Sequence, residues 1–163
     1  KMLQIDDRAI AKSIETASWP ARLQPLRTGP LAERAIASGA ELWLDGGHNP
    51  HAARALANAV AELDAADPRP LVMVMGMLAI KDAPGFLTAF EGMAQSLIAV
   101  PIPDHNSMAP ENLIDIAKGR GITATAANDV PHAIETITNQ NHKTPPRILI
   151  CGSLYLAGVV LGL

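Results

Sequence analysis

Residues 41–52 read Glu-Leu-Trp-Leu-Asp-Gly-Gly-His-Asn-Pro-His-Ala, and this stretch decides how the rest of the chain is interpreted. Its apolar half predicts a β-strand over residues 42–45, and Pro50 is typical of the first turn of a helix. The two glycines between them allow the backbone to approach a ligand closely. A strand, a glycine turn and a helix in this order are typical of nucleotide-handling proteins, with the chemistry placed where the strand ends.

The chain contains no G-x-x-x-x-G-K-[ST] sequence, the phosphate-binding loop that usually accompanies such an arrangement. The chain also begins at Lys1, with methionine second. We therefore expect it to be one part of an enzyme whose phosphate-binding part is encoded elsewhere.

The composition is that of one domain with an aliphatic core: 163 residues, 48% hydrophobic, 18% charged and 3% aromatic. A net charge of −3 gives no electrostatic argument for nucleic-acid binding. No apolar run approaches the roughly 20 residues that a membrane span needs. The single cysteine, Cys151, excludes an internal disulfide and favours a cytoplasmic protein. It follows an apolar run, which favours a core residue over a nucleophile.

Alternating patterns predict an α/β fold, a three-layer Rossmann-like domain with a mostly parallel sheet. The predicted strands are residues 42–45, 71–75, 97–100, 122–126 and 147–151. The predicted helices are residues 6–16, 52–63, 84–93, 110–118, 129–139 and 153–163. Residues 19–24 are interpreted as an extended linker, so that residues 1–18 form a leading segment and residues 19–163 the domain. Because ligands bind at the carboxyl ends of parallel strands, polar residues at those ends are the candidate site.

Asp45 ends the first of these strands and can accept hydrogen bonds from a ribose diol, or can stabilise the turn that follows. His48 and Asn49 lie at the start of the next helix, where free N–H groups favour anions such as phosphate. A metal site formed by Asp45, His48 and His51 is the alternative, but no fourth ligand is evident in the sequence. His51 is also compatible with a solvent-facing position in the first helical turn.

Further candidates follow the other strands. Lys81 can hold a carboxylate or phosphate as a point charge, or lie on the surface. Ser153 can bind a small carboxylate or cap the last helix. Arg22 can reach a nucleotide phosphate. A polar group after residue 100 consists of Asp104, His105 and Asn106, and is typical of a loop.

Four motifs occur in one order: Trp-Pro-x-Arg-Leu at 19–23, Leu-Asp-Gly-Gly-His-Asn-Pro-His-Ala at 44–52, Gly-Met-x-x-x-Lys-Asp at 76–82 and Cys-Gly-Ser-Leu-Tyr-Leu-Ala-Gly at 151–158. This series closely resembles the C-terminal domain of folylpolyglutamate synthase/dihydrofolate synthase, in the Mur ligase superfamily. The chain departs from the family pattern at Ala21, where glycine is common, and at Gly47, where alanine is common. Both changes leave the polar groups in place.

The resemblance implies an ATP-dependent ligase. In such enzymes ATP phosphorylates a pteroate or γ-glutamyl carboxylate, and the amine of glutamate then attacks the acyl phosphate. The implied partners are the N-terminal ATPase domain of the same polypeptide and the substrates L-glutamate and dihydropteroate or folate. ATP and Mg²⁺ would act in the full-length enzyme, whereas this fragment alone is expected to be inactive and to hold no metal.

The resemblance also implies roles for individual residues. Asp45 would bind the ribose and Arg22 would lie near the nucleotide. His48 and Asn49 would contact phosphate, and Lys81 and Ser153 would hold the glutamate carboxylates. His48 and Lys81 would act in catalysis by positioning and charge stabilisation, as is general for phosphoryl transfer, and none of these residues would be a nucleophile.

Two alternatives remain open. A peptidoglycan-precursor ligase shares the fold, but the sequences Trp-Pro-x-Arg and Gly-Ser-Leu-Tyr-Leu-Ala-Gly argue against it. The other is a non-enzymatic α/β module, receiver-like or nucleotide-sensing. A receiver needs an acid pair near the end of its first strand and a phospho-accepting aspartate, and this chain has no such pair there.

Overall fold

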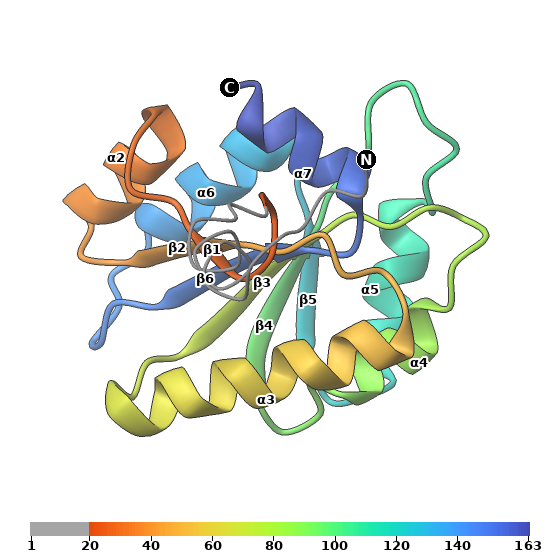
Figure 1. Cartoon of the computed structure of the whole chain (residues 1–163), viewed down its shortest axis with the longest axis horizontal. Helices are drawn as coiled ribbons and strands as arrows, with labels where there is room; N and C mark the ends of the chain where they lie inside the picture. Colours follow the sequence, from red (N-terminus) through yellow and green to blue (C-terminus); the bar gives the residue numbers. More distant parts are fainter. Residues whose placement is uncertain (1–19) are drawn as a thin grey trace, which may run out of the picture.

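The computed structural model describes residues 20–163, so the leading helix predicted over residues 6–16 lies outside the described part. A six-stranded sheet occupies the centre, in the order β1-β2-β6-β3-β4-β5 (Figure 1). The strands are β1 (Gln24–Pro25), β2 (Glu41–Leu44), β3 (Leu71–Met75), β4 (Ala94–Ala99), β5 (Thr123–Ala126) and β6 (Arg147–Cys151). The helices are α2 (Pro30–Ala37), α3 (Pro50–Ala66), α4 (Ala83–Thr88), α5 (Pro110–Lys118), α6 (Val130–Thr138) and α7 (Leu154–Leu161).

Helices cover both faces of the sheet. Helices α3, α4 and α5 pack on one face, and α2, α6 and α7 pack on the other (Figure 1). Successive side chains of a strand point to opposite faces, so Met73 and Met75 pack with the first group while Val72 and Val74 pack with the second. Among the strands of the described residues, only β1 is antiparallel to its neighbour. This three-layer arrangement confirms the predicted fold class.

The position of strand β6 marks the topological switch point of the sheet, where the connections that follow neighbouring strands pass to opposite faces. Strand β6 lies between β2 and β3, parallel to both. The helices that follow β2 and β3 pack on one face of the sheet, whereas α7, which follows β6, packs on the other. In open α/β sheets such a switch opens a crevice at the carboxyl ends of the strands. The ends of β2, β3 and β6 are therefore where the fold favours a ligand.

The central strands β3 and β6 and helix α5 have the bounds that the sequence predicts. Strand β1 and helix α2 were not predicted. The helix predicted over residues 84–93 ends at Thr88, because the chain continues in turns to Gly92, whose φ of +74° is left-handed. The sequence contains no apolar run long enough for a membrane span. In the structure, no helix within residues 20–163 is both long and apolar enough to span a bilayer.

The prediction that residues 19–24 are extended is wrong for the described residues 20–23. These residues form a turn in which Ala21 and Leu23 have φ values of +58° and +36°. Non-glycine residues rarely adopt this region, since it costs roughly 1–2 kcal/mol per residue. The surrounding structure must therefore hold the turn in place, and the contacts that do so belong to the candidate site described below.

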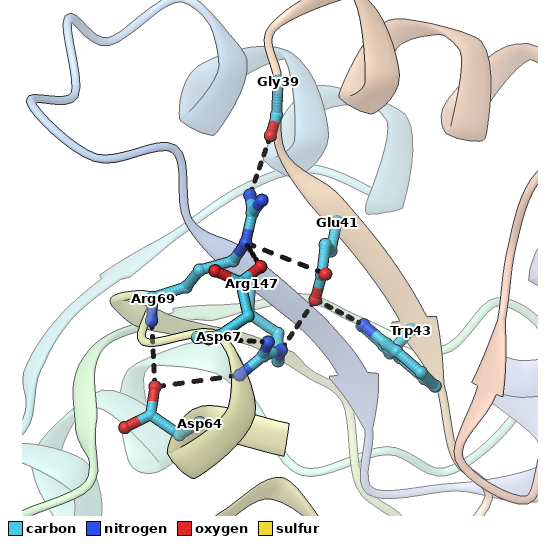
Figure 2. A network of polar contacts seen from close by, with 7 residues as sticks. All are labelled: Gly39, Glu41, Trp43, Asp64, Asp67, Arg69 and Arg147. Carbon is cyan, nitrogen blue, oxygen red and sulfur yellow. Dashed lines mark hydrogen bonds and ion pairs between the residues drawn. The ribbon is translucent and has the colours of Figure 1, made fainter.

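A polar network closes the amino ends of the strands, opposite the crevice (Figure 2). The Arg147 side chain, only 3% exposed, donates from Nε to Glu41 Oε2 at 2.7 Å and from a terminal nitrogen to the Asp67 carbonyl at 3.1 Å. Trp43 Nε1 donates to the same Glu41 oxygen at 3.0 Å. Arg147 and Glu41 are register partners in neighbouring strands, so this pair joins β2 to β6 directly.

Arg69 extends the network over the loop between α3 and β3. Its Nε donates to Asp67 Oδ2 at 2.7 Å, and a terminal nitrogen donates to the Gly39 carbonyl at 2.9 Å. Its backbone N–H donates to Asp64 Oδ1 at 2.9 Å. The network therefore ties the carboxyl end of α3 to the sheet.

We expect Arg147→Ala to lower the free energy of unfolding by about 1.5–3 kcal/mol, because it removes a buried guanidinium with its hydrogen bonds to Glu41 and to the Asp67 carbonyl, while Arg69 remains 3.7 Å from Glu41. The matched control is Arg34→Ala, which breaks an exposed ion pair with Glu135 whose side chains are 46% and 51% exposed. That control should cost no more than about 1 kcal/mol. Urea denaturation of both variants measures the difference, and equal losses would contradict a structural role for the network.

Candidate functional site

Asp45 organises the turn at the end of β2. Its Oδ1 accepts a hydrogen bond from the Gly47 N–H at 2.6 Å, and its Oδ2 accepts one from the Leu23 N–H at 2.8 Å. The Gly46 N–H donates to the Ala21 carbonyl at 2.7 Å. The turn-stabilising role that the sequence left open is thus present. A carboxylate has about four acceptor positions, so two remain for a ligand such as a diol.

His48 and Asn49 lie where helix α3 begins. Asn49 caps the helix: its Oδ1 accepts a hydrogen bond from the Ala52 N–H at 2.9 Å. The cap uses the amide oxygen, and the NH₂ group is the part of this side chain that can donate to an anion. His48 Nδ1 lies 3.1 Å from the Gly46 carbonyl oxygen. A carbonyl only accepts, so this bond requires the proton on Nδ1.

The structure brings the nucleotide candidates of the sequence into one groove with a volume of about 590 Å³. Arg22, Asp45, His48 and Asn49 all line it, together with His51. One wall is an apolar face of helix α3, formed by Ala52, Ala55, Leu56 and Ala59. The groove thus combines a carboxylate, basic side chains and helix N–H groups with an apolar surface.

Lys81 and Ser153 lie together in a second pocket of about 510 Å³. Ser153 is buried and caps helix α7, its Oγ accepting a hydrogen bond from the Tyr155 N–H at 3.1 Å. Its hydroxyl proton can still donate to a ligand. Leu78, Ile80 and the start of α7 supply the apolar lining.

The two pockets adjoin each other. His48 and Leu154 line both of them. The Gly152 N–H, one residue before Ser153, donates to the Gly47 carbonyl at 3.1 Å, which joins the two helix starts through the backbone. A ligand in the groove and a second ligand in the pocket would therefore meet beside His48.

The polar group at 104–106 borders the second pocket without being among its lining residues. Asn106 accepts a hydrogen bond at its carbonyl from the Ala79 N–H at 3.0 Å, so this loop pairs with the loop that carries Lys81. The His105 ring contacts the Tyr155 ring, with centroids 3.9 Å apart. The loop therefore supports the wall that Tyr155 contributes.

The metal alternative finds no geometric support. Across residues 20–163, no three His, Cys, Asp or Glu side chains lie close enough to hold a metal ion, which includes Asp45, His48 and His51. The donor set of the groove instead fits a nucleotide: a carboxylate with open acceptor positions for a diol, and a helix start beside the Arg22 guanidinium for phosphates.

Cys151 is a buried core residue at the end of β6, as the sequence favoured. Burial raises the pKa of its thiol, and the negative charge of nearby Asp45 raises the pKa further. The thiolate, which is the reactive form of cysteine, is therefore suppressed at neutral pH.

Several residues of these pockets had not been singled out from the sequence. Leu154 and Tyr155 are 58% and 53% exposed, and Ile80 is 82% exposed, although all three are apolar. The pattern of an apolar helix start gives no sign of which side chains face a pocket. Leu23 and the alanines of α3 likewise look like ordinary core or surface residues in sequence.

The comparison with known families agrees with this geometry. Residues 31–154 match the family described as "Mur ligase, glutamate ligase domain". The match covers most of the chain, so the chain belongs to this family of ligase domains. It confirms the family that the four sequence motifs had indicated.

The relatives within this family are folate enzymes. The chain is 27% identical over 158 residues to folylpolyglutamate synthase of Lacticaseibacillus casei, covering 93% of this chain and 31% of that protein. It is 31% identical over 134 residues to a probable bifunctional folylpolyglutamate synthase/dihydropteroate synthase of Halobacterium salinarum, covering 82% of this chain and 14% of that protein. The chain thus spans at most about a third of the length of these two relatives.

Solved structures show the same similarity. Folylpolyglutamate synthase of Mycobacterium tuberculosis complexed with ADP and AMPPCP has a TM-score of 0.78 and 25% identity, over 98% of this chain and 35% of that one. The bifunctional folylpolyglutamate synthase/dihydrofolate synthase of Yersinia pestis complexed with AMPPNP and a Mn ion has a TM-score of 0.74 and 26% identity, over 98% and 35%.

Gly152→Ala tests the backbone that places Ser153. Gly152 has φ of +103°, and a Cβ there would lie 2.7 Å from the Gly76 carbonyl oxygen. We expect a loss of about 2–4 kcal/mol in unfolding free energy from strain and overpacking. The control is Gly158→Ala within α7, where a Cβ meets nothing within 4 Å and should stabilise by roughly 0.5–1 kcal/mol. Thermal denaturation compares them, and an unchanged Gly152→Ala variant would contradict the close packing of β3 and β6.

Because the pKa of the buried Cys151 thiol is raised, we expect the protein to lose stability at alkaline pH. The pKa of this thiol is about 9.0 in the unfolded chain and is raised in the folded protein. Below pH 9 the thiol is protonated in both states, so its contribution to stability is fully present there. Above it the unfolded thiol ionises while the folded one stays protonated. The stability of the natural protein relative to Cys151→Ala should therefore fall by about 1.4 kcal/mol per pH unit above that value. Urea titrations at pH 8, 9 and 10.5 measure this difference, and a pH-independent difference would show that the thiol ionises equally in both states.

Proposed function

We propose that this chain is the C-terminal domain of an ATP-dependent ligase of the folylpolyglutamate synthase type, which joins glutamate to dihydropteroate or to a folyl-γ-glutamate. The observation that carries the proposal is the pair of adjoining pockets at the carboxyl ends of β2, β3 and β6, one with nucleotide-binding chemistry and one with a lysine and a serine. Support comes from the related structures, which were solved in complex with ADP and AMPPCP and with AMPPNP.

In this proposal the first groove takes the nucleotide. The open acceptor positions of Asp45 bind the ribose diol, and the apolar face of α3 lies beside the base. Arg22 and His48 approach the phosphates, where the N–H groups at the start of α3 add positive potential. Mg²⁺ would be held by the N-terminal ATPase domain, where it would neutralise phosphate charge.

The second pocket takes the incoming glutamate. The Lys81 ammonium attracts one carboxylate, and the Ser153 hydroxyl with the N–H groups at the start of α7 binds the other. His48 lies between the two pockets and faces the point where they meet.

The reaction needs two steps that these residues assist by positioning. The acceptor carboxylate attacks the γ-phosphorus of ATP, which gives an acyl phosphate and releases ADP. The glutamate amine, once deprotonated, attacks the acyl carbon; an amide bond forms and inorganic phosphate leaves. Residues that fix the amine within reach of the acyl carbon and balance phosphate charge lower the barrier without forming a covalent bond.

The other domain would cover the pockets. Ile80, Leu154 and Tyr155 are exposed apolar side chains that line the second pocket, and in this proposal the N-terminal ATPase domain of the same polypeptide packs on them. Closure of such an interface excludes water, which would otherwise hydrolyse the acyl phosphate. The Lacticaseibacillus casei and Mycobacterium tuberculosis enzymes are about three times as long as this chain, which leaves room for such a domain.

The test uses the full-length parent enzyme and measures ADP release with glutamate and either dihydropteroate or tetrahydrofolate. Lys81→Ala and Ser153→Ala should each raise the KM for glutamate, by about 10- to 100-fold for the lysine, since a hydrogen bond to a charged group contributes roughly 1.5–3 kcal/mol. The KM for ATP should change little.

Lys118→Ala is the matched control, since Lys118 lies at the far end of α5 and lines neither pocket. Turnover that needs no pteroate or folate would exclude the proposed reaction. An unchanged KM for glutamate in both variants would exclude the assignment of the second pocket.

A further inference from the structure

The turn at residues 20–23 is held in an unfavourable conformation. Ala21 and Leu23 both have positive φ, although neither is glycine. Such residues persist only where the surrounding contacts determine the backbone, and these residues are usually found at functional sites. Arg22, the basic residue of the nucleotide groove, lies between them.

The contacts that hold this turn come from the segment after β2. The Leu23 N–H donates to Asp45 Oδ2 at 2.8 Å, across 22 residues of sequence. The Ala21 carbonyl accepts from the Gly46 N–H at 2.7 Å. Both neighbours of Arg22 are therefore fixed to the same short segment, one of them by a side chain.

The second oxygen of Asp45 fixes the glycine turn itself. Oδ1 accepts from the Gly47 N–H at 2.6 Å, and the Gly47 carbonyl in turn accepts from the Gly152 N–H. One carboxylate thus joins the Arg22 turn, the glycine turn and, through one more hydrogen bond, the start of α7. A hydrogen bond from an N–H to an ionised carboxylate is stronger than one to a neutral acceptor, which suits this role.

We infer that Asp45 is a positioning residue for Arg22, in addition to binding the diol. The carboxylate holds residues 20–23 in the left-handed turn and so places the Arg22 guanidinium at the nucleotide groove. Both oxygens retain acceptor capacity, so the two roles are compatible. The part of this inference that concerns nucleotide rests on the proposed function; the part that concerns the turn does not.

The first experiment tests the turn without any ligand, by residue-resolved amide hydrogen exchange on this chain. In Asp45→Ala, exchange at the Leu23 and Gly47 amides should accelerate roughly tenfold or more, while the amides of β3 keep their protection. Asp45→Asn is the milder variant, since it keeps the size of the side chain and one of its two oxygens. The NH₂ group that replaces the other oxygen cannot accept, so either the Leu23 N–H or the Gly47 N–H loses its acceptor. Unchanged exchange at Leu23 in both variants would overturn the inference.

Asp129→Ala is the matched control. Asp129 likewise accepts a backbone N–H, from His132 at 2.7 Å, but at the start of α6 and away from both pockets. It should accelerate exchange near His132 and leave Leu23 unchanged. Acceleration at Leu23 in this control too would mean a general loosening of the fold, and would also overturn the inference.

The second experiment separates positioning from diol binding in the full-length parent enzyme. The probe is 2′,3′-dideoxy-ATP, which has no diol for Asp45 to bind. Asp45→Asn should still weaken its binding by roughly five- to tenfold, and this loss should disappear in an Arg22→Ala background, because residues that act through one another are not additive. If wild type and Asp45→Asn bound the dideoxy analogue with equal affinity, the only role of Asp45 toward the nucleotide would be to bind the diol, and the inference would be overturned.

The two experiments also distinguish this inference from the proposed function. If wild-type enzyme bound neither ATP nor the dideoxy analogue, the proposed nucleotide site would fail, and the inference that Asp45 places Arg22 for nucleotide would fail with it. The exchange result at Leu23 would still show whether Asp45 holds the turn.

Discussion

Burial of both faces of the parallel sheet restricts where polar side chains can lie. The central strands β3 and β6 are buried along their whole length, and the first residue of β6, Arg147, is the charged exception among them. A polar group in the interior would lose its hydration without a partner, at a cost of several kcal/mol. Polar chemistry is therefore displaced to the two ends of the strands, and the two ends carry different kinds of polar group.

At the amino ends the charged groups pair with one another. Arg147, Arg69, Glu41 and the aspartates near the end of α3 satisfy each other in a closed network (Figure 2). At the carboxyl ends the polar groups instead border pockets and keep unused hydrogen-bonding capacity. Asn49 and Ser153 each use a side-chain oxygen to cap a helix, and each still has a donor. Capping and ligand binding, which the sequence presents as alternatives, are thus compatible in the same side chain.

The predictable parts of the structure are those encoded by local pattern. Apolar runs set the bounds of β3 and β6, and the proline at the start of α5 set its beginning. Helix α2 was missed because its eight residues bury only Leu31 and two alanines, too weak a pattern to stand out, even though Gly29 precedes it and Pro30 begins it. The turn at residues 20–23 was misread for a different reason: left-handed Ala21 and Leu23 have no sequence signature, since their conformation comes from tertiary contacts.

The candidate site also has parts that follow from local sequence pattern and parts that depend on tertiary contacts. The position of Asp45 and Ser153 at strand ends could be inferred from the order of elements, but the bond from Asp45 to Leu23 depends on a chain crossing that local pattern does not encode. That His48 and Leu154 line both pockets also follows only from the start of α7 lying beside the start of α3, although the two helices cover opposite faces of the sheet. The insertion of β6 between β2 and β3 determines this placement.

Helix α3 connects the two ends of the sheet. It begins at the Asn49 cap beside the groove and, over 17 residues or roughly 26 Å, ends where Asp64 and Asp67 meet the arginine network. Between these points Ala53, Leu56, Ala57 and Val60 bury its inner face in the core on this side of the sheet. The contacts of Asp64 and Asp67 attach the end of the helix to Arg69 and to Arg147 of β6, while its start is attached to β2 through Gly46 and Gly47. The network far from the pockets therefore contributes to the placement of the helix start that forms the floor of the candidate site.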